Sequence, residues 1–102
     1  MLSEDCKDLI LFILDGHEAK KLVEYATNRQ GFGDNGNSIC YWFEEDLPIS
    51  LIEGQLLATS ELGDLEFIFN EQDYLELLHH RLHQMLEFRQ AKKLKALRQK
   101  SN

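Results

Sequence analysis

Residues 65–86 read LEFIFNEQDYLELLHHRLHQML, and the spacing of the apolar residues changes within this stretch. Over Leu65–Asn70 apolar and polar side chains largely alternate, which is typical of a half-buried antiparallel strand. The face that we expect to be buried carries Leu65, Phe67 and Phe69. From Asn70 or Glu71 onward, the apolar residues instead fall within an arc of about 120° on a helix. That arc consists of Tyr74, Leu75, Leu78, Leu82, Met85 and Leu86.

The N-terminal part of the chain predicts helical structure. Ser3 can cap a helix whose first turn carries acidic residues, and the apolar residues that follow are spaced as on a helix. Asp15-Gly16 then interrupts the pattern, and we expect Asp15 to cap a second helix, with Glu18 completing a capping box. A second interpretation makes Leu9–Leu14 a buried strand, because a short apolar run fits either structure.

The middle of the chain predicts a small antiparallel sheet. Gln30–Ser38 is rich in Gly and Asn and is expected to be a loop. Ile39–Phe43 is apolar on both faces and predicts a central strand. Ile49–Ile52 and Gln55–Ser60 predict weaker strands, and Glu61–Asp64 predicts a hairpin turn. The expected fold class is α+β, with one or more N-terminal helices, three to four strands and a long C-terminal helix.

Charge is distributed very unevenly along the chain. Between Gln30 and His80 there are eleven acidic residues and no Lys or Arg, whereas Arg89–Asn102 contains six basic residues and no acid. Residues 1–88 alone carry a net charge of −13, against −7 for the whole chain. We expect a single α+β domain over residues 1–88 and a basic helix extension or flexible tail over residues 89–102. The charge indicates the sign of a partner's surface rather than the fold.

Composition places the chain among water-soluble globular proteins. It is 43% apolar and 28% charged, and its longest apolar run, Leu9–Leu14, is far shorter than the ~20 residues that span a bilayer. Acidic residues precede that run, so it also makes a poor signal peptide. Cys6 and Cys40 lie in apolar contexts and are expected to be buried thiols. We therefore expect a cytoplasmic protein that does not contact a membrane.

The histidines near the end of the last predicted helix are the residues best suited to bind a metal ion. His79 and His83 are four positions apart and could share a metal with Glu76 or Glu87. However, the zincin pattern requires Glu directly after the first His, and His80 occupies that position. We expect a solvated polar face here, and neither a metal site nor a cofactor. The alternative is a small metal-binding protein or metal-dependent enzyme that uses His79, His80 and His83.

No pattern in the chain predicts an enzyme. Asp34 and Glu45 have the separation of the two ends of a calcium loop, but Gly36 and Ile39 stand where an oxygen ligand and a glycine are required. The glycine-rich stretch has no Lys to hold a phosphate, and no serine lies in a nucleophile elbow. The many carboxylates have no spacing that singles out an acid–base pair.

The acidic stretch has two interpretations, a solvated face that keeps the protein soluble or a recognition surface. The second predicts a non-enzymatic module that neutralises or regulates a basic protein, with carboxylates blocking its cationic groove. Bacterial immunity proteins that block nucleases or other basic toxins are similar in size and charge, but no motif is shared. The expected partner-binding residues are Trp42, as an aromatic anchor, with Glu44, Glu45, Asp46, Glu53, Glu61, Asp64 and Glu66.

The basic C-terminal stretch also has alternative interpretations. Cations at the end of a helix complement its dipole. They could instead form an arm that contacts nucleic acid, as in a regulatory adaptor, although six cations without interleaved aromatic residues do not lead us to expect direct binding. Leu94 and Leu97 could pack against a second copy, which leaves a homodimer through the C-terminal helix open.

Overall fold

The computed structural model describes residues 2–34, 36–61 and 64–101 and has an α+β fold, as predicted. Four strands form one antiparallel sheet in the order β1-β2-β3-β4. The elements, in chain order, are α1 (Glu4–Leu14), α2 (Ala19–Asn28), β1 (Phe32–Asp34), β2 (Asn37–Tyr41), β3 (Gln55–Ser60), β4 (Leu65–Asn70), α3 (Glu71–Gln84) and α4 (Phe88–Ser101).

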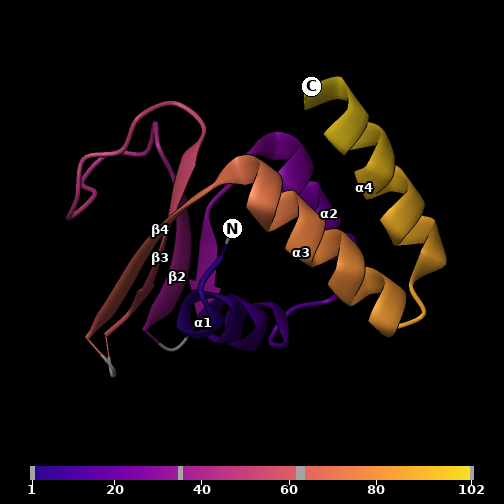
Figure 1. Cartoon of the computed structure of the whole chain (residues 1–102), viewed down its shortest axis with the longest axis horizontal. Helices are drawn as coiled ribbons and strands as arrows, with labels where there is room; N and C mark the ends of the chain where they lie inside the picture. Colours follow the sequence, from indigo (N-terminus) through magenta and orange to yellow (C-terminus); the bar gives the residue numbers. More distant parts are fainter. Residues whose placement is uncertain (1, 35, 62–63, 102) are drawn as a thin grey trace.

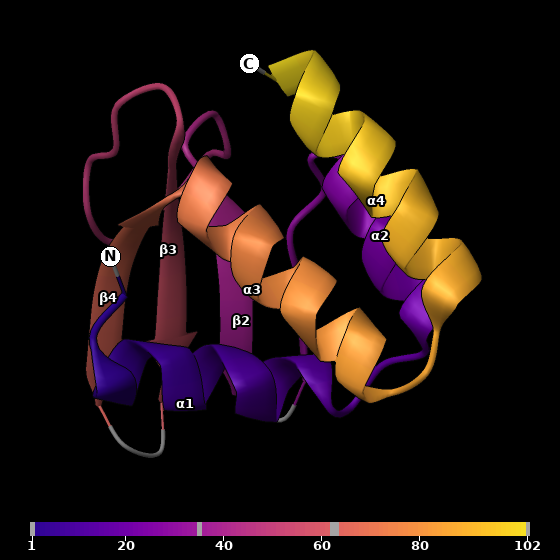
Figure 2. The ribbon, with the colours of Figure 1, turned by 45° about the vertical axis from the view of Figure 1, so that its right-hand side comes forward.

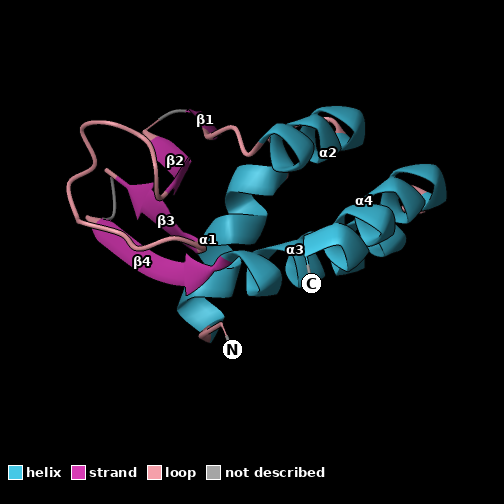
Figure 3. Ribbon diagram, turned by 90° about the horizontal axis from the view of Figure 1, so that it is seen from above, coloured by secondary structure: helices cyan, strands magenta, loops and turns pink. Residues whose placement is uncertain are grey.

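The helices lie on one side of the sheet, and the other side carries no helix (Figure 1). Helix α1 packs against β2 and β3, and α3 follows β4 directly and packs against α4. Helices α2 and α4 lie side by side at the end of the molecule away from the sheet (Figures 1 and 3). The largest side chains that are fully buried are Tyr41, Tyr74, Ile10, Leu14, Leu22, Ile39, Leu56, Leu57, Leu75, Leu78, Leu82 and Leu94.

The N-terminal run is a helix, which decides between the two interpretations of Leu9–Leu14. The Ser3 hydroxyl accepts a hydrogen bond from the Cys6 backbone N–H at 3.2 Å, as an N-cap does. The prediction that Asp15 caps α2 is wrong. Its own backbone is still helical and its N–H donates to Leu11, so Asp15 ends α1 and lacks the extended conformation of an N-cap. The N-cap of α2 is Glu18, whose side chain makes no capping hydrogen bond.

The sheet differs from the prediction at three places. Gln30–Ser38 is not all loop, because it contains β1 and the first residues of β2. Strand β2 ends at Tyr41, where the N–H of Glu44 donates to the Tyr41 carbonyl and closes a turn. Ile49–Ile52 forms no strand. Its end is a turn closed by two hydrogen bonds. The Gln55 N–H donates to the Ile52 carbonyl, and the Ile52 N–H donates to the side-chain oxygen of Gln55.

The strand-to-helix boundary at Asn70 is confirmed, and its carboxamide accepts a hydrogen bond from the Asp73 N–H at 2.8 Å. The C-terminal helix is confirmed too, but it is separate from α3. Leu86 has a positive φ of 60°, which ends the preceding helix and turns the chain back. Met85 and Leu86, expected in the core, are therefore 41% and 73% exposed.

Helix α4 packs on the body of the protein (Figure 2). Ala91 and Leu94 are buried in the same core as α2 and α3, and Leu97 packs against it. The sequence left open that Leu94 and Leu97 pack against a second copy; in the structure these two side chains contact the chain's own core. The first half of the basic stretch thus contributes to the core that residues 1–88 form.

Candidate protein-binding surface on the outer face of the sheet

The outer face of the sheet, which points away from the helices, carries every second residue of β2, β3 and β4. In β2 the buried residues Ile39 and Tyr41 belong to the core on the helix side, so Ser38 and Cys40 point outward. Leu57 in β3 also points outward and is nevertheless fully buried, because the loop that follows β2 covers it. Figure 1 shows this loop, residues 42–54, leaving one end of the sheet and bending back along the outer side.

A hollow of about 340 Å³ lies between this loop and the outer face. Its floor includes Ser38 and Thr59, whose hydroxyls are 2.7 Å apart, together with Cys40 and Leu57. Its acidic lining consists of Glu44, Glu45, Asp46, Glu61, Asp64 and Glu66. These are six of the seven carboxylates predicted to bind a partner. We call this hollow with its six carboxylates the acidic hollow. Glu53 and Trp42 do not line it.

The carboxylates reach the acidic hollow from three separate segments. One group comes from the loop after β2, a second from the turn between β3 and β4, and Glu66 from the outer side of β4. Asp46 and Asp64 have positive φ angles of 61° and 51°, a conformation that Asp tolerates better than most residues. Both residues therefore help to shape the turns that bring the carboxylates together.

Glu44 stabilises the loop that follows β2. Its carboxylate accepts a hydrogen bond from the Tyr41 N–H just past the end of the ladder. It also lies against Gly31, where an added Cβ would be 2.5 Å from Glu44 Oε2. Burial raises the pKa of the nearby Cys40 thiol; a hydrogen bond with Ser38 lowers it, and the charge of Glu44 raises it further. A thiol with a raised pKa is a poor nucleophile, which agrees with a structural Cys40.

Within the described part of the chain, no ion pair reaches the carboxylates of the acidic hollow. Elsewhere among the described residues, ion pairs join Lys7 to Glu4, Lys21 to Glu24, Arg29 to Glu71, and Arg81 to Asp15. Because no Lys or Arg occurs between Gln30 and His80, the loop and strands that form the hollow bring no cation of their own. Carboxylates held together without a cation repel one another. Binding of a positively charged group would relieve this repulsion and is therefore electrostatically favourable.

Trp42, the predicted anchor, lies on the helix side of this region. Its ring is half-buried, packs against the core, and has the Arg29 guanidinium 5.2 Å from its centroid. Phe43, the next residue, is 56% exposed. Ile68 on the outer side of β4 and Leu65 at its start are also partly exposed, at 46% and 43%. The sequence predicted strands at all three residues. Phe43 is exposed because β2 ends at Tyr41 and leaves it in the loop, whereas Leu65 and Ile68 belong to β4 at the edge of the sheet.

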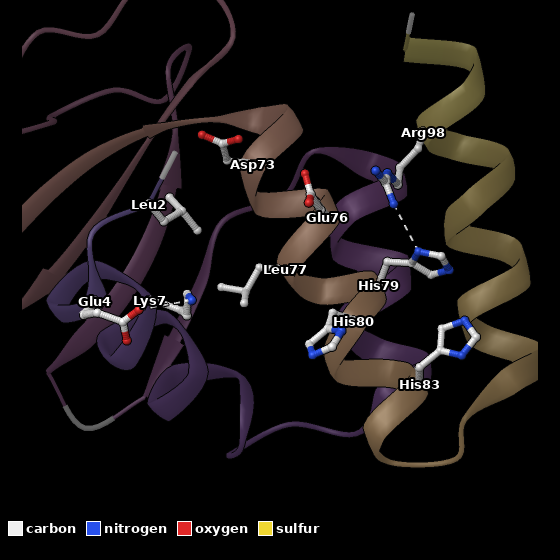
Figure 4. Close-up of a pocket in the computed structure, with 10 residues that line it drawn as sticks. All are labelled: Leu2, Glu4, Lys7, Asp73, Glu76, Leu77, His79, His80, His83 and Arg98. Carbon is white, nitrogen blue, oxygen red and sulfur yellow. Dashed lines mark hydrogen bonds and ion pairs between the residues drawn. The ribbon is translucent and has the colours of Figure 1, made fainter.

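The histidines lie in a different place, a groove of about 780 Å³ lined by the start of α1, by α3 and by Arg98 of α4 (Figure 4). An Arg98 nitrogen is 3.0 Å from Nδ1 of His79. Burial lowers the pKa of His79, and the positive charge of His83, Arg98, Lys95 and His80 lowers it further. Among the described residues no group of three or more His, Cys, Asp or Glu side chains is arranged to hold a metal ion.

The basic residues of α4 lie at the end of the molecule opposite the sheet (Figure 1). Arg89, Lys92, Lys93 and Lys95 are exposed. The uneven distribution of charge along the sequence is therefore also a separation in space, with acidic groups on the outer face of the sheet and basic groups on the last helix. None of the helices in the described ranges is long and apolar enough to cross a membrane.

We compared the chain with protein-family models, with curated proteins and with solved structures, and none of the three comparisons found a match.

Proposed function

We propose that this protein is a non-enzymatic module that binds a basic protein partner through the acidic hollow and thereby neutralises or regulates it. The observation that carries the proposal is the convergence of six carboxylates on one hollow with no cation paired to them in the described part of the chain. A partner with Lys and Arg side chains at its surface would relieve their repulsion and would be steered toward the hollow over a long range.

Neutralisation would follow from occlusion. If the partner's basic groove normally holds a phosphate backbone, the carboxylates of the acidic hollow would occupy the positions of the phosphates. A nuclease toxin blocked by a bacterial immunity protein is the kind of pair that fits this chemistry, and a cytoplasmic site of action fits it too. Because the binding is electrostatic, the association rate should fall steeply as salt increases.

The test is charge reversal at Glu45, Glu61 and Glu66, which are exposed and make no hydrogen bond through their side chains among the described contacts. Glu44 is left unchanged because it supports the loop. Asp46 and Asp64 are left unchanged because Lys would be strained at a positive φ. The matched control reverses three exposed carboxylates on the helices, Asp8, Glu24 and Glu76, and so has the same net charge.

Untagged wild-type protein and both variants are immobilised and exposed to an extract of the native host at low salt. We expect the wild type and the control to retain the same basic protein, and the variant altered in the hollow to lose it. Purified partner should then show association that weakens strongly with salt for the wild type only. If the variant altered in the hollow retains the same proteins as the wild type, the proposal is wrong.

A further inference from the structure

Strand β4 is an edge of the sheet, and β3 is its one neighbour among the described strands. Its register with β3 is continuous from Gln55 opposite Asn70 to Ser60 opposite Leu65, so it has no bulge. It also contains neither Pro nor Lys, the residues that commonly protect an edge strand from a further strand. An open edge of this length is a surface to which an extended segment can add.

The register identifies the backbone groups on that open edge. The N–H of Glu71 donates to the Gly54 carbonyl at 2.8 Å, one step beyond the last pair of the β3–β4 ladder. Hydrogen-bonded pairs alternate in an antiparallel ladder, so the residues of β4 an even number of positions from Glu71 turn their backbone groups toward β3. Glu66 and Ile68 are at odd separations and turn theirs outward. Outside the β3–β4 ladder, no backbone hydrogen bond of the described chain uses either residue.

The side chains beside this edge set the character of a segment that could pair with it. Glu66 is exposed and lines the acidic hollow, and Ile68 lies on the same outer side. Leu65 and Phe67 alternate with these residues along β4. Leu65 is exposed and also borders the acidic hollow, and Phe67 is half-buried and packs against the core on the helix side. A strand placed next to β4 therefore meets Glu66 and Ile68, beside the acidic hollow, on one face and apolar side chains on the other.

We propose that β4 accepts an extended segment of the basic partner as a fifth strand of the sheet. The segment alternates Lys or Arg, whose charged groups face Glu66 and the acidic hollow, with apolar residues that cover Leu65 and Phe67. The aliphatic stems of the basic residues would cover Ile68. This inference rests on the proposed function, because it specifies how the basic partner reaches the acidic hollow.

A second copy of this chain fits the edge poorly. If the β4 strands of two copies paired, the carboxylates of Glu61, Asp64 and Glu66 in one copy would lie close to the same carboxylates in the other copy. Like charges at a sheet edge oppose self-pairing but leave the edge open to a cationic strand.

The test uses an acetylated and amidated peptide of about eight residues that alternates Lys and Val, a length typical of a strand. Its binding to the full-length wild-type protein is measured by calorimetry at low salt. Two further peptides carry backbone N-methyl groups, one on every Lys and the other on every Val. Only one set of amides can face β4, so one methylated peptide should lose about tenfold or more in affinity while the other binds like the parent.

The matched protein variants are Ile68→Pro and Ile68→Thr. Proline at position 68 removes an N–H that points away from β3, which an edge strand tolerates, while Thr keeps that N–H. We expect Ile68→Pro to lose about tenfold in affinity and Ile68→Thr about twofold. Circular dichroism establishes whether Ile68→Pro is folded. If it is not, the two methylated peptides on wild-type protein still decide the question.

Several results would overturn the edge pairing. These are no peptide binding at low salt, equal affinity of the two methylated peptides, or folded Ile68→Pro that binds like the wild type. A wild-type dimer that Ile68→Pro converts to a monomer would assign the edge to a second copy instead. If Ile68→Pro binds normally while reversal at Glu45, Glu61 and Glu66 abolishes binding, the edge pairing fails but the proposed function stands.

Discussion

The guanidinium of Arg29 donates two hydrogen bonds of 2.9 Å to the carboxylate of Glu71, forty-two positions further along the chain. Arg29 lies just beyond the end of α2 and Glu71 is the first residue of α3, so this pair ties the two helices together beside the sheet. Among the residues whose burial is described, Glu71 is the only acidic one that is buried. Its ion pair with Arg29 offsets the free-energy cost of removing the carboxylate from water.

We expect Glu71→Ala to lower the free energy of unfolding by about 2–3 kcal/mol, because it leaves Arg29 without its carboxylate. This is below the range for a fully buried pair, since the Arg29 side chain is 46% exposed. The measurement is urea unfolding followed by the emission of Trp42, the one tryptophan of the chain. Glu4→Ala, which breaks the exposed pair with Lys7, should change stability little. Equal effects of the two substitutions would contradict the structural role of Glu71.

Leu94 tests whether α4 is part of the folded body. Its side chain is fully buried, so Leu94→Ala should lower the free energy of unfolding by about 2–4 kcal/mol. Lys93→Ala, one position earlier and exposed, is the control and should have almost no effect. Removal of residues 88–102 should likewise destabilise the remaining chain. If the shortened chain unfolds at the same denaturant concentration as the wild type, the basic stretch is a separate tail.

The lowered pKa of His79 predicts that the protein loses stability as the pH falls. Its pKa is lowered in the folded state by burial and by the nearby cations, so between that value and the ordinary ~6.5 the unfolded chain binds more protons. The contribution of His79 to stability is complete above the ordinary pKa and is lost as the pH falls below it. His79→Gln keeps an acceptor for Arg98 but does not titrate.

The measurement is the free energy of unfolding at several values between about pH 7.5 and pH 5.5, compared for wild type, His79→Gln and the control His80→Gln. We expect His79→Gln to show a weaker dependence on pH than either of the other two proteins. A slope that is the same for His79→Gln and wild type would show that protonation of His79 does not weaken the contact with Arg98.

Cys40 should react slowly with alkylating reagents, because burial raises its pKa and little thiolate is present near neutral pH. With Cys6 replaced by Ser, the rate of reaction with iodoacetamide reports Cys40 alone. We expect a rate well below that of a free thiol at about pH 8, rising as the pH increases, and recovery of the free-thiol rate in urea. A native rate equal to that in urea would mean that the floor of the acidic hollow is open to solvent.

Local spacing in the sequence was sufficient for several elements. Alternation in Leu65–Asn70, followed by helical spacing from Glu71, identified β4 and α3, and Ser3 marked the start of α1. The same spacing did not identify β1, because three residues rich in Gly carry no periodic signal. It also extended the apolar arc of α3 through Leu86. The positive φ at that residue depends on how α4 folds back over the core, which no local pattern records.

What the sequence alone determined is the composition of the binding surface: the acidic residues, the absence of cations from Gln30 to His80, and the residue types of the strands. Only the tertiary structure decided their arrangement. It brought Glu45 and Glu66 to one hollow, left Trp42 outside it, placed β4 at the edge, and joined Arg29 to Glu71. The physical reason is that strand order and loop path depend on hydrogen bonds and packing between distant segments, whereas periodicity reports only which face of each segment is apolar.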